Sequence, residues 1–234
     1  WSRRELLTHG GAGLLATGLL AACQPVTSPG AQASSPALAM PQQTQTSALQ
    51  TPTQAAAVPD LAAKLGQMIM AGFRGFTATA DAPIVTDVVK RHVGSLVLFS
   101  YDVALVSGER NIQSPTQVAQ LTAALQRFAP TPLLIAADQE GGLVARLNEQ
   151  HGFPPTVSAQ ELGEQNDPTY TYAQAEIMAK TLAAAGVNHN LAPVVDVNTN
   201  PDNPVIGSLG RSFSADPTKV TEQARAFIQA HHAH

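Results

Sequence analysis

The sequence has a single cysteine, Cys23, so no disulfide can form within the chain, and an anchoring role for this thiol outweighs a redox role. Charged residues make up only 13% of the chain, the formal net charge is -4, and no long basic run occurs. This composition leaves no electrostatic footprint for nucleic acid, which is therefore not an expected partner. No apolar run is long enough to span a bilayer, so membrane contact is expected only through a lipid on Cys23.

The N-terminal residues have the features of an export signal. Arg3 and Arg4 precede a modest apolar run at 10–22, which is typical of a twin-arginine signal. The run ends in Leu-Ala-Ala-Cys at Cys23, which resembles the lipobox where bacterial lipoproteins are cleaved and acylated. The alternative is an ordinary secretory signal with an incidental cysteine. We expect residues 1–23 to be a lipoprotein signal and the protein to be exported and lipid-anchored at the cell envelope.

The composition then changes twice along the chain. Residues 24–59 consist mainly of Pro, Ser, Thr, Gln and Ala without one charged residue, and such a segment cannot bury enough surface to fold. It is predicted to be a disordered tether. The remaining residues, 60–234, number about 175 and suit one domain. Because the chain starts at Trp1 and stops at His234 inside an unfinished helical pattern, we expect it to be a fragment of a longer protein.

The domain has the alternation of an α/β fold. Segments with helical spacing separate four apolar runs that are expected to be parallel strands, at 67–73, 93–99, 133–137 and 187–195. Three helices carry a capping side chain followed by proline at their first turn, Ser114-Pro115, Asp167-Pro168 and Asp216-Pro217. Two core-facing stripes follow, Val118, Leu121, Leu125 and Phe128 in one helix and Val220, Ala224, Phe227 and Ile228 in another.

Periodicity alone does not separate a doubly wound sheet from a barrel. No G-x-G-x-x-G follows a strand and no Walker lysine loop is present, which removes the usual nucleotide motifs of the doubly wound class. The long loop at 198–213 favours a barrel whose site is built from loops. We expect a (β/α)8 TIM-type barrel, of which about the first four β/α units are present.

The most informative stretch is Asp-Gln-Glu-Gly-Gly, which begins at Asp138 directly after the apolar run 133–137. A continuous apolar run predicts a strand buried on both faces, and ligands of parallel sheets collect at the carboxyl ends of strands. The acid, two glycines that allow close approach, and Arg146 beyond them favour a polyhydroxyl ligand held by charge-assisted hydrogen bonds. The alternative is a helix N-cap followed by a tight turn.

A second polar region follows the fourth apolar run. Asp196 could orient Arg211 in a bidentate pair, leaving the guanidinium aimed at a ligand. Alternatively, Asp196 only holds the backbone of its loop, as aspartate side chains commonly do.

Together these motifs resemble the N-terminal barrel domain of glycoside hydrolase family three. The resemblance runs from about Leu61 to the end of the chain and rests on several motifs in the same order. These are Asp138 to Gly142 with Arg146-Leu147 and Phe153-Pro154, then Ala185 to Asn188, Ala192-Pro193-Val194, Asp196-Val197-Asn198, Pro204 to Gly207 and Arg211-Ser212-Phe213. The D-x-E-G-G form resembles the β-N-acetylhexosaminidase branch, whereas the β-glucosidase branch tends to have Asp followed by His-Gly here.

The resemblance implies a role for several residues. Asp138 would bind hydroxyls of the non-reducing sugar, and Arg146 and Arg211 would line the same subsite. Glu140 matches the motif but is interpreted as a carboxylate that structures its loop. The implied reaction is retaining hydrolysis of terminal β-linked N-acetylglucosamine from peptidoglycan- or chitin-derived saccharides, through a covalent glycosyl-enzyme intermediate. Both the nucleophile and the acid/base of this branch are expected beyond His234.

Other functions and ligands remain as alternatives. β-Glucosidase activity is the alternative within the family, and a non-catalytic lipoprotein that binds a solute or glycan is the alternative outside the enzyme class. His231 and His234 could lie on one helix face, but the family pattern requires no metal, and no metal or cofactor is expected. The fragment itself is expected to hydrolyse nothing, because it lacks both catalytic groups of this branch. The sequence does not indicate an oligomeric state.

Overall fold

A computed structural model describes residues 60–234 except residue 109, and the predicted signal and tether lie outside the described residues. Four strands form a parallel sheet in the order β1-β2-β3-β6. They are β1 (Met70–Gly72), β2 (Ser95–Leu98), β3 (Leu134–Ala137) and β6 (His189–Asn190). Each predicted apolar run contains one strand, but the expected strand at 187–195 is wrong over most of its length, because only its third and fourth residues pair with β3.

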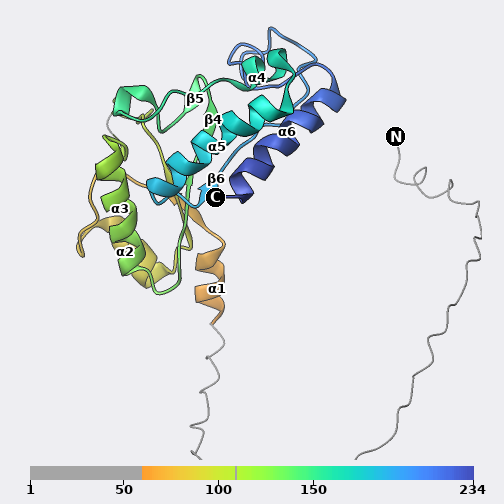
Figure 1. Cartoon of the computed structure of the whole chain (residues 1–234). Coiled ribbons are helices and arrows are strands. Elements are labelled where there is room, and N and C mark those ends of the chain that lie inside the picture. The colour runs from red at the N-terminus through yellow and green to blue at the C-terminus, as the bar shows by residue number, and fades with distance from the viewer. Residues whose placement is uncertain (1–59, 109) are drawn as a thin grey trace, which may run out of the picture. The chain divides into compact units, whose positions relative to one another are not determined.

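Helices connect the successive parallel strands, as expected for parallel pairing, and one further helix precedes β1 and another follows β6. They are α1 (Leu61–Gln67), α2 (Pro83–Arg91), α3 (Pro115–Phe128), α4 (Ala159–Gln165), α5 (Pro168–Ala184) and α6 (Pro217–His232), with a short 3-10 turn η2 (Glu149–His151). Figure 1 shows α5 and α6 lying side by side. A four-stranded parallel sheet with crossover helices agrees with the first half of the predicted (β/α)8 barrel.

The three predicted helix starts are confirmed. Ser114, Asp167 and Asp216 are N-caps whose side chains accept hydrogen bonds from backbone N–H groups two or three residues ahead. In α4 a capping box that the sequence analysis missed joins Ser158 and Glu161. Such side chains satisfy amide groups that have no partner within the helix, so they fix where each helix begins.

The core consists of two clusters of buried apolar side chains. The first packs β2 and β3 against α2 and α3, and its members include Leu96, Leu98, Leu121, Leu125 and Ile135. The second joins α4, α5 and α6 through residues such as Leu162, Met178, Phe213 and Phe227. The predicted stripes are confirmed at their buried positions, but Ile228 is wrong as a core residue, because its side chain remains 38% exposed.

An antiparallel pair follows β3 at the end of the sheet where the predicted ligand residues lie. It consists of β4 (Gln139–Gly141) and β5 (Val144–Ala145). The alternative interpretation of this stretch as a helix N-cap is therefore wrong. None of the helices in the described ranges is both long and apolar enough to cross a membrane.

Candidate functional site

Gln139 holds the segment that carries the two acidic residues of the motif. Its side chain is fully buried, and its amide donates to the carbonyl oxygen of Leu147 at 2.9 Å while its Oε1 accepts from the Leu147 N–H at 3.0 Å. From β6, the side chain of Asn190 bonds both backbone groups of Gln139 at 3.1 Å. These bonds satisfy a buried amide completely and tie the segment to two neighbouring elements. This role of Gln139 was not predicted, because it depends on residues that are distant along the chain.

Asp138 and Arg146 form the first ion pair of the site. Arg146 donates from Nε at 3.1 Å and from Nη2 at 2.7 Å, and both bonds end on Oδ2 of Asp138. The backbone N–H of Arg146 also donates to the carbonyl oxygen of Asp138 at 3.2 Å. Both side chains are about one quarter exposed. Because Arg146 uses one carboxylate oxygen, the other oxygen of Asp138 is left for a hydroxyl of a ligand.

Glu140 and Arg211 form the second pair, and its geometry differs. Arg211 donates from Nε and Nη2 to the two oxygens of Glu140, each at 2.8 Å, and its Nη1 reaches the carbonyl oxygen of Val205 at 3.3 Å. The Glu140 side chain is only 7% exposed. The hydrogen bond to Glu140 is the main reason that the pKa of Arg211 lies above its usual value. The interpretation of Glu140 as a carboxylate that structures its loop agrees with this pair.

The predicted pairing of Asp196 with Arg211 is wrong, because the guanidinium fork of Arg211 is taken by Glu140. Asp196 is exposed, and it supports its loop through its carbonyl oxygen, which accepts from Ser212 Oγ at 2.5 Å. The loop is thus held by a backbone group rather than by the aspartate side chain. A second bond from Ser212 Oγ reaches the Ser214 carbonyl oxygen at 3.1 Å.

The two glycines of the motif make room for the protein's own backbone. A Cβ on Gly141 would lie 2.0 Å from the carbonyl oxygen of Val157, and one on Gly142 would lie 2.7 Å from the Cβ of Ser158. Both glycines also have positive φ angles, +100° and +58°. Only glycine adopts such angles readily, so both positions require it. The glycines were expected to let a ligand approach the backbone, but the group that lies against them is the segment before α4.

Asp138, Arg146 and Arg211 line one cavity. Its volume is about 350 Å³, and its other lining residues are Glu140, Leu143, Val144 and Leu209. The structure thus brings together the acid after the third strand and the arginine beyond the fourth, which the sequence analysis placed in a common pocket. Two paired guanidinium groups and apolar side chains around a partly exposed carboxylate suit a neutral, hydroxyl-rich ligand.

An aromatic ring connects this cavity to the loop that follows β2. The guanidinium carbon of Arg110 lies 4.7 Å from the centre of the Phe99 ring, and that of Arg146 lies 5.7 Å from it. Both distances are within the range of cation–π attraction. This contact of Phe99 with two arginines was not predicted, because the arginines are 11 and 47 positions away.

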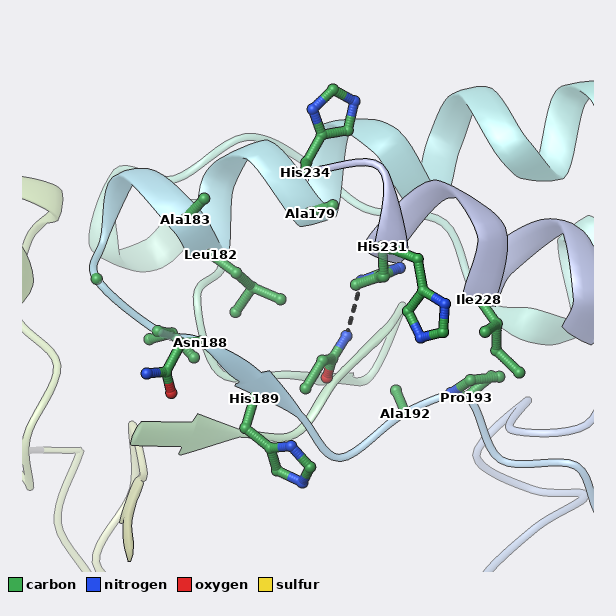
Figure 2. A pocket seen from close by; sticks show the side chains of 14 residues that line it. Ala179, Leu182, Ala183, Asn188, His189, Ala192, Pro193, Ile228, His231 and His234 are labelled. Carbon is green, nitrogen blue, oxygen red and sulfur yellow. Dashed lines mark hydrogen bonds between the residues drawn. The ribbon is translucent and has the colours of Figure 1, made fainter. Parts of the chain in front are cut away.

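A larger cavity of about 780 Å³ lies along β6 between α5 and α6 (Figure 2). Its lining is apolar apart from asparagines and histidines and contains no carboxylate or arginine. His231 packs its ring on Phe227 at 4.5 Å and donates from Nδ1 to the Phe227 carbonyl oxygen, while Nε2 accepts from Asn190 at 3.0 Å. Burial lowers the pKa of His231. These contacts hold His231 as a neutral ring with both nitrogens hydrogen-bonded, so neither nitrogen is left for a ligand. We therefore assign the ligand site to the smaller cavity, which is lined by charged side chains.

The remaining predicted residues are not brought into a site. Cys23 lies outside the described residues, so its acylation stays a prediction. Within 60–234, apart from residue 109, no three histidine, cysteine, aspartate or glutamate side chains are grouped so that they could hold a metal ion. His234 contacts Glu176 at 2.9 Å instead of joining His231.

Comparison with known proteins places these features in a family. The model of the "Glycosyl hydrolase family 3 N terminal domain" matches residues 60–234. The chain is 35% identical over 190 residues to "Beta-hexosaminidase A" of Pseudoalteromonas piscicida, an alignment that covers 72% of this chain and 30% of that protein.

Two solved structures are also similar. One is a glycoside hydrolase family 3 beta-N-acetylglucosaminidase from Paenibacillus sp. str. FPU-7, with a TM-score of 0.67 and 36% identity over 75% of this chain and 31% of that one. The other is the beta-N-acetylhexosaminidase from Beutenbergia cavernae DSM 12333, with a TM-score of 0.64 and 31% identity over 76% of this chain and 52% of that one. The chain therefore spans between about a third and a half of the length of these relatives. Its residues 60–234 belong to the N-terminal domain of glycosyl hydrolase family 3.

Proposed function

We propose that this domain supplies the sugar-binding part of an exo-acting, retaining glycoside hydrolase that removes terminal β-linked N-acetylglucosamine from peptidoglycan- or chitin-derived saccharides. The observation that carries the proposal is the shared cavity of Asp138, Arg146 and Arg211 in a domain of this family. The names of the relatives, beta-hexosaminidase and beta-N-acetylglucosaminidase, support the choice of sugar.

Asp138 is the residue that we assign to the sugar hydroxyls. Its Oδ2 is fixed by two bonds from Arg146, which orient the carboxylate before a ligand arrives. A sugar hydroxyl then donates to the remaining oxygen in a charge-assisted hydrogen bond. Preorganisation of this kind lowers the cost of ordering the site on binding.

Arg211 has a more limited role in the same cavity. Three of its N–H groups already bond protein oxygens within the described chain, on Glu140 and on Val205. A guanidinium carries five donors, so two remain for an oxygen of the ligand. Its position is set by Glu140, which makes Arg211 a rigid donor rather than a mobile cation.

Retaining hydrolysis needs a carboxylate nucleophile and a general acid/base in addition to these contacts. We propose that both come from the part of the protein beyond His234, as the family resemblance implies. The 234-residue chain is then expected to bind sugar weakly and to hydrolyse nothing. We also propose export by the twin-arginine signal, acylation of Cys23 and a role in peptidoglycan turnover, on the sequence motifs alone.

The test is to assay the longer protein with 4-nitrophenyl glycosides of β-N-acetylglucosamine and β-glucose. We expect a clear preference for the N-acetylglucosaminide, with the β-anomer as first product by NMR. Asp138→Ala should reduce kcat/KM by roughly 10²- to 10³-fold, the loss of a charged hydrogen bond. Preference for the glucoside would show the alternative activity within the family, and no turnover of either substrate would favour a binding lipoprotein.

A further inference from the structure

A short hairpin lies between β2 and α3, and its two ends are joined by hydrogen bonds. At its base the N–H of Asn111 donates to the Phe99 carbonyl oxygen at 3.1 Å, and Asn111 Oδ1 accepts from the Phe99 N–H at 3.2 Å. Further out, Asp102 and Ser107 form an antiparallel bridge with bonds of 2.7 and 3.2 Å. Hydrogen bonds therefore close the hairpin at its base and again nearer its tip. Residues 101–107 are called the apolar hairpin below.

A buried aspartate gives this hairpin a fixed shape. The Asp102 side chain is fully buried, forms a bidentate pair with Arg74, and accepts from the N–H groups of Ala104 and Leu105 at 3.1 Å each. The bond from Arg74 is the main reason that the pKa of Asp102 lies below its usual value. The Asp102 carboxylate thus joins the hairpin to Arg74 and holds the turn at Ala104 and Leu105.

The tip presents apolar side chains to solvent. Val103 and Val106 are each 78% exposed and Leu105 is 64% exposed, with Tyr101 beside them at 46%. Val106 also has a φ of +50°, an unfavourable value for a β-branched residue. Surface turns normally carry Gly, Pro, Asn, Asp or Ser. The tip thus combines one strained residue with three exposed aliphatic side chains. This combination indicates a surface that contacts an apolar partner.

We propose that the apolar hairpin inserts Val103, Leu105 and Val106 into the surface of a lipid bilayer. A convex tip of a few side chains is much smaller than the roughly 800 Å² per partner that a stable protein interface buries. The backbone N–H groups of Asp102, Ala104, Leu105 and Ser107 are bonded within the hairpin, which lowers the cost of bringing this part of the backbone to a lipid surface. Tyr101 has the amphipathic character of residues found at the membrane interface.

The predicted tether makes this contact geometrically available. The composition of residues 24–59 predicts a tether, and a flexible chain of that length has a root-mean-square span of roughly 30 to 36 Å, so acylation of Cys23 would keep the domain close to the bilayer. Insertion of the tip does not depend on that acylation. It adds a second, weaker attachment that sets the orientation of the domain.

The orientation has a consequence for the sugar cavity. Phe99 at the base of the hairpin lies against Arg146, the partner of Asp138, so hairpin and cavity belong to the same end of the sheet. A domain attached by its tip holds this cavity near the lipid surface. The favoured substrates are then glycans that lie close to the bilayer.

Vesicle sedimentation of the full chain carrying Cys23→Ser tests the proposal without an attached lipid. The probe is vesicles of phosphatidylethanolamine and phosphatidylglycerol. Leu105→Asp combined with Val106→Asp is expected to lower the partition coefficient by about tenfold or more, since each substitution puts a carboxylate in place of an aliphatic side chain that the bilayer would bury. The matched control changes two equally exposed apolar residues elsewhere, Leu61→Asp with Met68→Asp at 71% and 82%, and should lower it less than about twofold.

A fluorescence measurement locates the tip directly. Leu105→Trp in a chain carrying Trp1→Phe should show a blue-shifted emission on vesicle addition and quenching by lipids brominated in their acyl chains. Equal partitioning of the hairpin variant and the parent, or emission that vesicles leave unchanged, would overturn the proposal. Loss of a dimer in the hairpin variant by sedimentation velocity, without an effect of vesicles, would overturn it in favour of a second copy as the partner.

Discussion

The two arginine–carboxylate pairs of the cavity differ in how they use their oxygens. In the pair of Asp138 with Arg146, both donors meet one oxygen, and both side chains are about one quarter exposed. In the pair of Glu140 with Arg211, two parallel bonds occupy both oxygens, and the Glu140 side chain is only 7% exposed. The first pair keeps an acceptor for a ligand, whereas the second is complete without one.

Sequence separation explains why the pairs have different tasks. Arg146 follows Asp138 by eight residues across the β4–β5 hairpin, so their contact adds little long-range order. Arg211 joins Glu140 across 71 positions and fixes the long loop before α6 against β4. Closure of a long loop has a large entropic cost, and the buried pair helps to offset it. Of two neighbouring acids in one motif, Glu140 therefore holds the loop, whereas Asp138 keeps a free oxygen for the ligand that we propose.

The largest effect is expected for Gly141→Ala, which disturbs the segment that carries both acids. Alanine at a φ of +100° is strained, and its Cβ would lie 2.0 Å from the Val157 carbonyl oxygen. We expect a loss of about 3 to 5 kcal/mol in the free energy of unfolding, measured by urea denaturation. Gly108→Ala is the matched control, because its Cβ would meet no atom within 4 Å, and its change should stay within about 0.5 kcal/mol. Similar losses for the two variants would contradict the assigned role of Gly141.

A smaller effect is expected for Glu140→Ala, and it tests the comparison of the pairs directly. Removal of Glu140 leaves the guanidinium of Arg211 largely buried without its partner, at a cost of about 2 to 4 kcal/mol. Asp138→Ala leaves Arg146 with nearly the same exposure, 27% against 22% for Arg211, but it removes a more exposed carboxylate and a contact across only eight residues, so it should cost less, about 1 to 2 kcal/mol. Urea denaturation of both variants measures the difference.

The double variant with Glu140→Ala and Arg211→Ala is the control for this prediction. It should be less destabilised than the sum of its single variants, because no charge is then left alone. Equal losses for Glu140→Ala and Asp138→Ala would show that the two pairs have the same structural role.

Local sequence signals predicted much of the fold. Each apolar run contained a strand, and Ser114, Asp167 and Asp216 began their helices, because strand burial and helix capping depend on neighbouring residues. The strand at 187–195 was overestimated, because pairing with β3 requires geometry that an apolar run does not specify.

The candidate site was predicted in its members but less well in its contacts. Asp138, Arg146 and Arg211 do line one cavity, although their role in binding sugar stays a prediction. Asp196, which is nearer in sequence, was considered as a partner of Arg211 beside the alternative that it only holds its loop, whereas the structure places Glu140 against Arg211. Such a choice depends on how distant segments pack. The family motifs predicted the residues that line this cavity, and only the structure showed that Glu140 has both oxygens bonded to Arg211 whereas Asp138 has one oxygen bonded to Arg146.

The smallest effect concerns His231 in the larger cavity, which contrasts with the charged site. Burial lowers the pKa of this ring below the ordinary value of 6.5, so the unfolded chain binds a proton more readily than the folded one. The stability that depends on the neutral ring is therefore complete above about pH 6.5 and decreases as the pH falls toward the folded-state pKa. His231→Gln should make Tm less sensitive to pH across this acidic window, measured by thermal denaturation followed by circular dichroism. Unchanged acid sensitivity in His231→Gln would mean that another group causes it, and that the neutral hydrogen bonds to Asn190 and Phe227 do not control the stability of this end of the domain.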